Sequence, residues 1–303
     1  MKRPLLAMWL AAAVQAGAWA APAQVLQVED AERFAALLAD GRLPDADTLQ
    51  RAYLTPGSAG VALFTPGRIE SAQHLAQTLH AQPQAYRKAI ALCLPAARDI
   101  AQPAGALMVE VARRLGQPAE GAPAFALFGA MNSGGTAKAQ GLGLGLEVLC
   151  QSVDTPQDAR ALLLDFVAHE ITHVHQQRHA PDDVRFTLLY ATLMEGFADY
   201  MMEQARGAPS GPSADRERYG LAHEAELWRA FQADVARGAG FGDWLYKARP
   251  ARAGQPADMG YWLGKRLCEA FVARAPDRAA ALHTLLLLRD PAAIVAASGY
   301  APR

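Results

Sequence analysis

The segment His169-Glu170-Ile171-Thr172-His173 places two imidazoles and a carboxylate at a spacing that can bind and use a metal ion. Helical residues four positions apart are separated by about 400° of rotation and 6 Å of rise, so both imidazoles project from one face. Glu170 flanks that face, where its carboxylate can reach a water at the metal without being a ligand. We therefore predict a Zn²⁺ site here; the alternative is a pair of solvated surface histidines.

A catalytic zinc site has three protein ligands and one open position, so a third ligand is needed. His179 stands where the last histidine of the metzincin pattern His-Glu-x-x-His-x-x-Gly-x-x-His falls. That pattern needs a glycine to turn the chain, and Gln176 occupies its position. A continuing helix would carry His179 about 15 Å along the axis from His169. His175 points away from the face of His173, and we expect His175 and His179 to be exposed polar residues.

Glu195, in the next predicted helix, is the second candidate for the third ligand. Asp199 lies four residues later on the same face, so one carboxylate can bind zinc while the other accepts the ring N–H of a zinc-bound histidine. Gly196 in mid-helix costs about 1 kcal/mol relative to alanine, and close approach of the two helices at the metal would explain it. We predict Glu195 as the ligand; the alternative is a solvated helix face.

These residues resemble the gluzincin metallopeptidases, which have His-Glu-x-x-His on one helix and Glu-x-x-x-Asp on the next. More narrowly, the chain resembles the predicted zinc-dependent protease family DUF2268 in segments 166–176, 195–200 and, more weakly, 260–266. The resemblance extends over about residues 122–300. It implies hydrolase chemistry and a zincin-like fold, in which a small sheet packs over the active-site helix. It names no substrate.

The predicted function is hydrolysis of a peptide or protein substrate. Zinc would lower the pKa of its water toward about 7, and Glu170 would take the proton as the water attacks the scissile carbonyl and then pass it to the leaving amine. The oxyanion needs a further stabiliser. Tyr261 is the first candidate and His223 the second, the alternative for Tyr261 being a packed aromatic with a hydrogen-bonded hydroxyl.

The same residues are compatible with three other functions. A non-catalytic protein could keep zinc for folding, but structural zinc sites normally have four protein ligands and need no flanking carboxylate such as Glu170. A metzincin-like hydrolase would use His179 as the third ligand. Hydrolysis of a non-peptide amide or ester is a further alternative.

Helix signals place the candidate residues on two helices in tandem. Thr155 as N-cap, Pro156 at the first helical position and Asp158 at the capping-box position predict a helix that runs to about Arg178. A second helix with an apolar stripe follows residues 181–183 and ends at Gly207. Further helices are predicted at about 221–236, 261–274 and 279–288.

The segment before these helices has the pattern of a small sheet. Residues 125–128 are strand-like, Gly134-Gly135 is a turn, and residues 141–149 alternate with period two. The Gly-x-Gly-x-Gly run within 141–145 lacks dinucleotide-binding spacing, which argues against a Rossmann site. Glycines in a strand often mark close approach of another backbone, so this strand would suit a sheet edge where an extended peptide lies.

The amino terminus resembles an export signal. Lys2 and Arg3 precede an apolar stretch, and Ala18-Trp19-Ala20 supplies a small-x-small cleavage pattern. We predict a signal peptide at 1–20, cleavage near Ala20 and a periplasmic or secreted protein; the alternative is an uncleaved anchor.

Four or five short helices are expected between about residues 27 and 116. The predicted organisation is therefore an N-terminal helical region at 21–116 and a zincin-like domain at 117–303, α+β and mainly helical.

Composition excludes several partners. A net charge of -1, without a basic block, argues against nucleic acid. No later apolar run reaches the ~20 residues that span a bilayer.

Cys93, Cys150 and Cys268 are widely spaced and odd in number, so a disulfide framework is not expected. One pair could be bridged, but a small buried apolar role is expected for each. The oligomeric state is not determined by the sequence.

Overall fold

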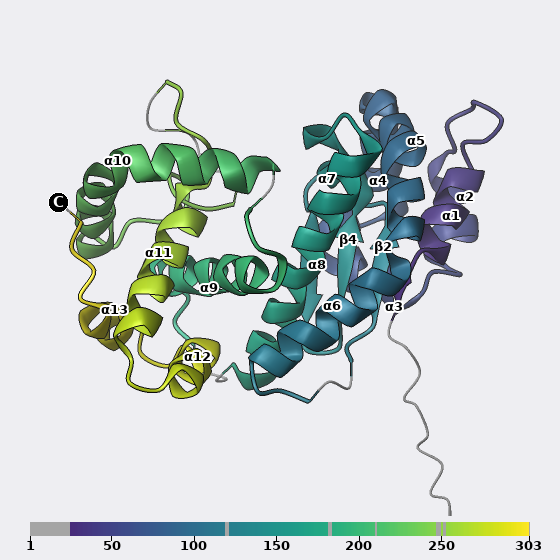
Figure 1. Cartoon of the computed structure of the whole chain (residues 1–303). Helices are drawn as coiled ribbons and strands as arrows, with labels where there is room; N and C mark the ends of the chain where they lie inside the picture. The colour runs from purple at the N-terminus through teal and green to yellow at the C-terminus, as the bar shows by residue number, and fades with distance from the viewer. Residues whose placement is uncertain are drawn as a thin grey trace, which may run out of the picture.

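The computed structural model describes residues 25–118, 121–180, 184–209, 211–246, 250 and 253–302. The predicted signal peptide and residues 181–183, after which the second tandem helix is predicted to start, lie outside the described residues. The fold is mainly helical with one small mixed sheet, which confirms the predicted α+β, mainly helical class (Figure 1). Within the described ranges, no helix combines the length and the apolar character needed to cross a membrane.

The sheet has four strands in the order β1-β2-β4-β3. β2 is parallel to both β1 and β4, and β3 is antiparallel to β4. The strands are β1 (Leu26–Gln27), β2 (Ala124–Leu127), β3 (Gly135–Lys138) and β4 (Gly141–Gly145).

The glycine-rich strand differs from the prediction in two respects. It is β4, in the interior of the sheet, because β2 pairs with one side of it and β3 with the other; the edge strand is β3. β4 also ends at Gly145, and the rest of the predicted strand is the short helix α7 (Leu146–Leu149). Leu146 and Leu149 are both buried, and their spacing of three residues fits a helical turn better than a strand.

The N-terminal region contains six α-helices rather than the expected four or five. Two of them are only four and six residues long, and each runs into a π-helical turn, so they are too short to show a clear apolar period. The segments are α1 (Glu29–Ala36), α2 (Ala46–Leu49), η1 (Gln50–Leu54), α3 (Ala59–Phe64), η2 (Thr65–Ile69), α4 (Ala72–Ala81), α5 (Pro83–Asp99) and α6 (Ala101–Arg114).

These helices share one continuous hydrophobic core with the sheet. α3 packs on β2 and β4, α1 packs on β2, and α5 and α6 pack on α8 (Pro156–His179). β1 also belongs to this region and pairs with β2. The change of composition near Gly116 is therefore not accompanied by a break in the core.

The first tandem helix begins and ends where the sequence signals predict, whereas the second ends as predicted but begins only at Leu188, after the non-helical residues 184–187. The Thr155 side chain accepts a hydrogen bond from the Asp158 backbone N–H at 3.1 Å and caps α8. Thr187 caps α9 (Leu188–Arg206) in the same way, through the backbone N–H of Tyr190. Gly207, with φ of 91°, ends α9 in a conformation that glycine adopts readily.

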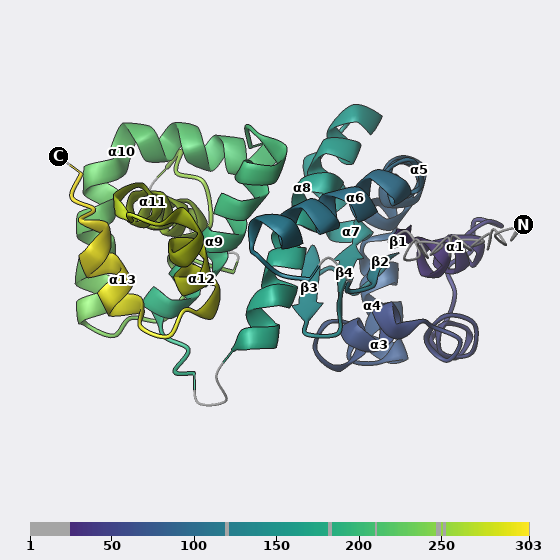
Figure 2. The ribbon, with the colours of Figure 1, turned by 60° about the horizontal axis from the view of Figure 1, so that its bottom comes forward.

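The remaining helices lie on the other side of α8 from the sheet and α1–α5, as Figures 1 and 2 show from two directions. α10 begins ten residues earlier than predicted, whereas the next two helices agree closely with the prediction. These helices are α10 (Gly211–Ala236), α11 (Met259–Arg274), α12 (Arg278–Leu287) and α13 (Pro291–Ser298).

A close backbone contact joins α9 to α11. A Cβ added to Gly196 would lie 2.0 Å from the carbonyl carbon of Gly264, and one added to Gly264 would lie 1.9 Å from the carbonyl oxygen of Thr192. The glycine in mid-helix therefore permits contact with α11, and not, as predicted, with the histidine-bearing helix. This contact fixes the position of α9, which carries Glu195.

We expect Gly196→Ala to destabilise the protein by about 1–3 kcal/mol, because the added methyl group forces two helix backbones apart. Chemical denaturation followed by circular dichroism measures the change in the free energy of unfolding. Gly240→Ala is the matched control, since no atom lies within 4 Å of its added Cβ. Equal stability of the two variants would show that the helix contact is not tight.

A disulfide joins Cys93 of α5 to Cys150, which follows α7, whereas Cys268 is free and buried. The expectation of a small apolar role is thus wrong for Cys93 and Cys150. Sequence spacing carried no signal, because the two cysteines are 57 residues apart and meet only when α5 packs against α7 and the turn after it.

Replacing both bridged cysteines by serine should lower the free energy of unfolding by about 4 kcal/mol, since the disulfide closes a long loop in the unfolded chain. Denaturation of the oxidised protein, the reduced protein and the double variant measures this. Cys268→Ser changes no bridge, and the separation between oxidised and reduced forms should persist in that background. If reduction leaves the stability of the wild type unchanged, the bridge does not form in solution.

Candidate metal centre

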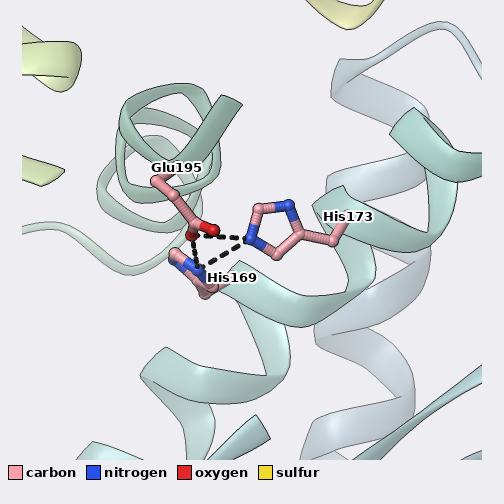
Figure 3. A group of neighbouring side chains, drawn as sticks. All are labelled: His169, His173 and Glu195. Atoms are coloured by element: carbon pink, nitrogen blue, oxygen red, sulfur yellow. Dashed lines mark hydrogen bonds and ion pairs between the residues drawn. The ribbon is translucent and has the colours of Figure 1, made fainter. Parts of the chain in front are cut away.

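His169, His173 and Glu195 bring three potential metal ligands to one point (Figure 3). The two histidines come from α8 and the glutamate from α9. The His169 and His173 Nε2 atoms are 3.0 Å apart, and Glu195 Oε2 lies 3.2 Å from the first and 3.0 Å from the second. His169 and Glu195 are buried, and His173 is nearly so.

These distances and donor types fit a tetrahedral metal ion. Ligand atoms at 2.0–2.1 Å from a tetrahedral zinc ion are roughly 3.3 Å apart, close to the observed 3.0–3.2 Å. Two imidazole nitrogens and a carboxylate oxygen form a ligand set that zinc accepts, and a fourth position would be left for a non-protein ligand. The residues present therefore fit a metal ion of this class.

The outward nitrogen of each imidazole has its own hydrogen-bond partner. His169 Nδ1 lies 2.8 Å from Asp199 Oδ1, and His173 Nδ1 lies 2.6 Å from Gln176 Oε1. If each Nδ1 carries the proton, each Nε2 lone pair is directed at the common point. Asp199 thus has the predicted place beside a histidine ligand. Gln176 orients the second histidine, His173. From the sequence alone, Gln176 is notable only because it occupies the glycine position of the metzincin pattern.

Gln176 also ties the two helices together. Its side-chain amide donates a hydrogen bond of 3.1 Å to the backbone carbonyl of Met194, the residue before Glu195. The same side chain therefore positions one imidazole on α8 and the backbone next to the carboxylate on α9. A glycine at this position could do neither.

The electrostatics of the site favour a cation between these groups. Burial alone lowers the pKa of His169, but Asp199 and Glu195 outweigh it and raise the pKa to about 10. Burial raises the pKa of the Glu195 carboxyl, yet the two adjacent histidines hold it well below its usual range. Without a metal, positive charge is therefore supplied by a proton on the imidazoles, and a divalent ion can replace it.

Glu170 lies beside this group and against the edge strand. Its carboxyl is buried, and burial raises its pKa, although the neighbouring His173 and His169 act in the opposite direction. A Cβ added to Gly135 of β3 would lie 2.1 Å from Glu170 Oε1. Glycine at this position of β3 therefore makes room for the carboxylate next to the proposed metal ligands.

A cavity of about 810 Å³ opens onto the group. Its wall includes the three potential ligands, Glu170 and the whole of β3, together with residues of α9, α10 and α11. A peptide-sized ligand could therefore reach Glu170 and the metal position from the same space.

Tyr261 and His223, the two candidates for an oxyanion stabiliser, lie in different places. The Tyr261 ring lines the cavity and stacks on the His169 ring at 6.0 Å between centroids. Arg216 lies over the same ring, 5.2 Å from its centroid. His223 lines a separate, smaller cavity, where it stacks on Tyr219, so it is not part of this site. The sequence could not place it, because α10 is kinked at His223 itself.

The two remaining histidines of α8 are outside the group. His179 contacts Gln117, with 2.7 Å between Nε2 and Oε1, at the end of the helix. His175 is buried rather than exposed as predicted, and burial lowers its pKa to about 4. The packing of α5 and α6 on α8 was not evident from the sequence pattern of α8 alone.

Tyr246 is a site residue that sequence inspection missed. Its hydroxyl donates a hydrogen bond of 3.0 Å to Glu195 Oε1, the oxygen that does not face the histidines. Its backbone φ is 61°, a value that tyrosine rarely adopts. No motif marks this residue, because it follows a short irregular stretch 51 residues after Glu195.

Comparison with family models, with curated proteins and with solved structures gave no match for this chain. The resemblance to gluzincins and to DUF2268 stays a prediction, and function is inferred below from the site itself.

We expect the protein to bind one divalent ion per chain and His173→Ala to lose it, because two of three ligands cannot hold the ion tightly. Elemental analysis after dialysis and competition with a zinc-binding dye measure stoichiometry and affinity. Asp199→Asn should weaken binding by about 10–100-fold through loss of its hold on His169. His179→Ala is the control and should bind normally; loss of metal in this variant with retention in Glu195→Ala would overturn the assignment.

Proposed function

We propose that this protein is a zinc-dependent metallopeptidase of the gluzincin type. The observation that carries the proposal is a buried Glu170 beside a His-His-Glu ligand triangle in the wall of a large cavity. The sheet packed along α8, with edge strand β3 against Glu170, supports a zincin-like arrangement in the proposed domain at 117–303.

Zinc is the proposed ion because its preferred ligands include imidazole and carboxylate in a tetrahedral site. When bound, zinc would supply Lewis acidity, which activates a water molecule and polarises the scissile carbonyl. His169, His173 and Glu195 would hold it, while Asp199 and Gln176 keep the two imidazoles in the required tautomer and orientation.

Glu170 is the proposed general base and acid. Its carboxylate accepts a proton from the attacking water and donates it to the amine that leaves. Burial raises its pKa, and a base whose pKa is nearer to the working pH transfers a proton in both directions more readily. Its position against Gly135 holds the carboxylate next to the wall where a substrate would lie.

Tyr246 is better placed than Tyr261 to stabilise the developing oxyanion. Its hydroxyl already lies at the ligand group, 3.0 Å from Glu195, and its strained backbone is of a kind that concentrates at functional sites. The Tyr261 ring stacks on His169 and also contacts the Arg216 guanidinium, which favours a role in holding that imidazole. We therefore assign the oxyanion contact to Tyr246 first, with Tyr261 as the alternative.

The Cys93–Cys150 disulfide supports the proposed export. Disulfides persist in oxidising compartments such as the periplasm or the extracellular space and are uncommon in the cytosol. This is consistent with the signal peptide predicted at 1–20.

A non-catalytic zinc-binding protein is the second candidate. Two observations disfavour it. Among the described residues, only three protein ligands lie at the site, on a cavity wall, whereas a structural zinc site is normally closed by a fourth protein ligand. A structural site also needs no buried carboxylate such as Glu170 beside the ligands.

The decisive variant is Glu170→Gln, which should keep one zinc per chain and lose at least ~100-fold in kcat/KM, since the amide cannot accept the proton. Cleavage of a broad peptide library, read by mass spectrometry, measures activity and separates peptide from other products. The exposed Glu70→Gln is the matched control and should be fully active. If the zinc-loaded wild type cleaves nothing in the library, the result favours the second candidate, a non-catalytic zinc-binding protein.

A further inference from the structure

Three positively charged side chains follow β3 along one wall of the cavity region. Arg68 and Lys138 line the cavity, and Arg178, near the end of α8, lies just beyond the strand. All three are exposed, and none forms an ion pair within the described residues. We refer to Arg68, Lys138 and Arg178 as the cationic wall.

The position of Arg68 is fixed at two points. Its backbone carbonyl accepts a hydrogen bond of 2.8 Å from the Asn132 side chain, and its Nε donates to Thr136 Oγ1 at 3.2 Å. Arg178 is attached to the same region, because its Nε donates to the Ala139 carbonyl at 2.9 Å. Both guanidinium groups of the cationic wall are therefore held beside β3 rather than left free in solvent.

The segment that carries β3 and β4 supplies no acidic side chain to pair with these cations. Residues 121–146 contain no aspartate or glutamate. The charged cavity residues away from β3 are different: Asp199 contacts Arg216, and Asp165 contacts Arg206. Among the described residues, the cavity cations that form no ion pair are thus concentrated on the β3 side.

The spacing of the cations matches an extended peptide. Thr136 and Lys138 lie two positions apart on β3 and so project from the same face, about 7 Å apart along the strand. Alternate side chains of an extended substrate have the same spacing. Arg68 is hydrogen-bonded to Thr136. Thr136 is the next residue of the strand after Gly135, and Gly135 lies against Glu170.

We propose that the cationic wall selects extended peptide segments with acidic side chains at alternate positions, one of them within two residues of the bond to be cleaved. Arg68 contacts the acidic side chain nearer Glu170, and Lys138 contacts the next one along. Arg178 adds long-range attraction at the far end. This inference rests on the proposed function for the cleavage step, but the binding preference can be measured without cleavage.

The test uses the zinc-loaded Glu170→Gln protein and four fluorescent peptides of equal length. The first has Glu-x-Glu, the second has the two glutamates adjacent, and the third and fourth have glutamine or lysine in place of glutamate. Fluorescence anisotropy at two salt concentrations measures each Kd. We expect the Glu-x-Glu peptide to bind about tenfold more tightly than the glutamine peptide, with a difference that shrinks at high salt.

Arg68→Gln and Lys138→Gln, each added to that background, should remove most of this preference. Arg289→Gln, an exposed arginine away from the cavity, is the matched control and should retain it. Circular dichroism confirms that each variant is folded. Equal binding of all four peptides, or a preference that survives both substitutions, would overturn the inference. Failure of the proposed function is a different result: wild-type protein that binds the acidic peptide selectively and leaves it uncleaved.

Discussion

The site depends on one interaction above all, the burial of the Glu195 carboxylate against two imidazoles of a neighbouring helix. Buried ionisable groups are costly unless other charges and hydrogen bonds compensate them. Here compensation comes from His169, His173 and the hydroxyl of Tyr246, which together contact both carboxylate oxygens. A divalent cation at the same point would replace the imidazole protons and supply the positive charge that the buried carboxylate needs, so the arrangement favours metal binding energetically as well as geometrically.

The surrounding helices maintain this arrangement at short range. α9 cannot move away from α8 without losing the Gln176 bond to its backbone, and it cannot move toward α11 because Gly196 and Gly264 are already in contact. α11 in turn supplies Tyr261, whose ring packs on His169. The backbone around Glu195 is therefore held from two sides, by the Gln176 hydrogen bond on one and by the contact with the α11 backbone on the other.

The small sheet borders the candidate site through its edge strand rather than its centre. β3 faces Glu170 through a glycine and carries or anchors the positive charges of the cationic wall. The carboxylates of the site come mainly from helices, and the cations that form no ion pair with another described residue lie at the strand. This separation of charge gives the cavity an orientation, and an extended acidic ligand would lie along the strand rather than across it.

The sequence by itself determined the local features of the site. Helical periodicity places His169 and His173 on one face, capping residues fix the start of α8, and the spacing of Glu195 and Asp199 puts both carboxylates on the same side of α9. These follow from the geometry of a single helix. Only the tertiary structure decided which strand forms the sheet edge, that Cys93 meets Cys150, that Gly196 faces α11, that His175 is buried, and that Arg68 and Tyr246 reach the cavity. Each of these depends on packing between segments far apart in the chain, and the periodicity of one segment contains no information about the partner it packs against.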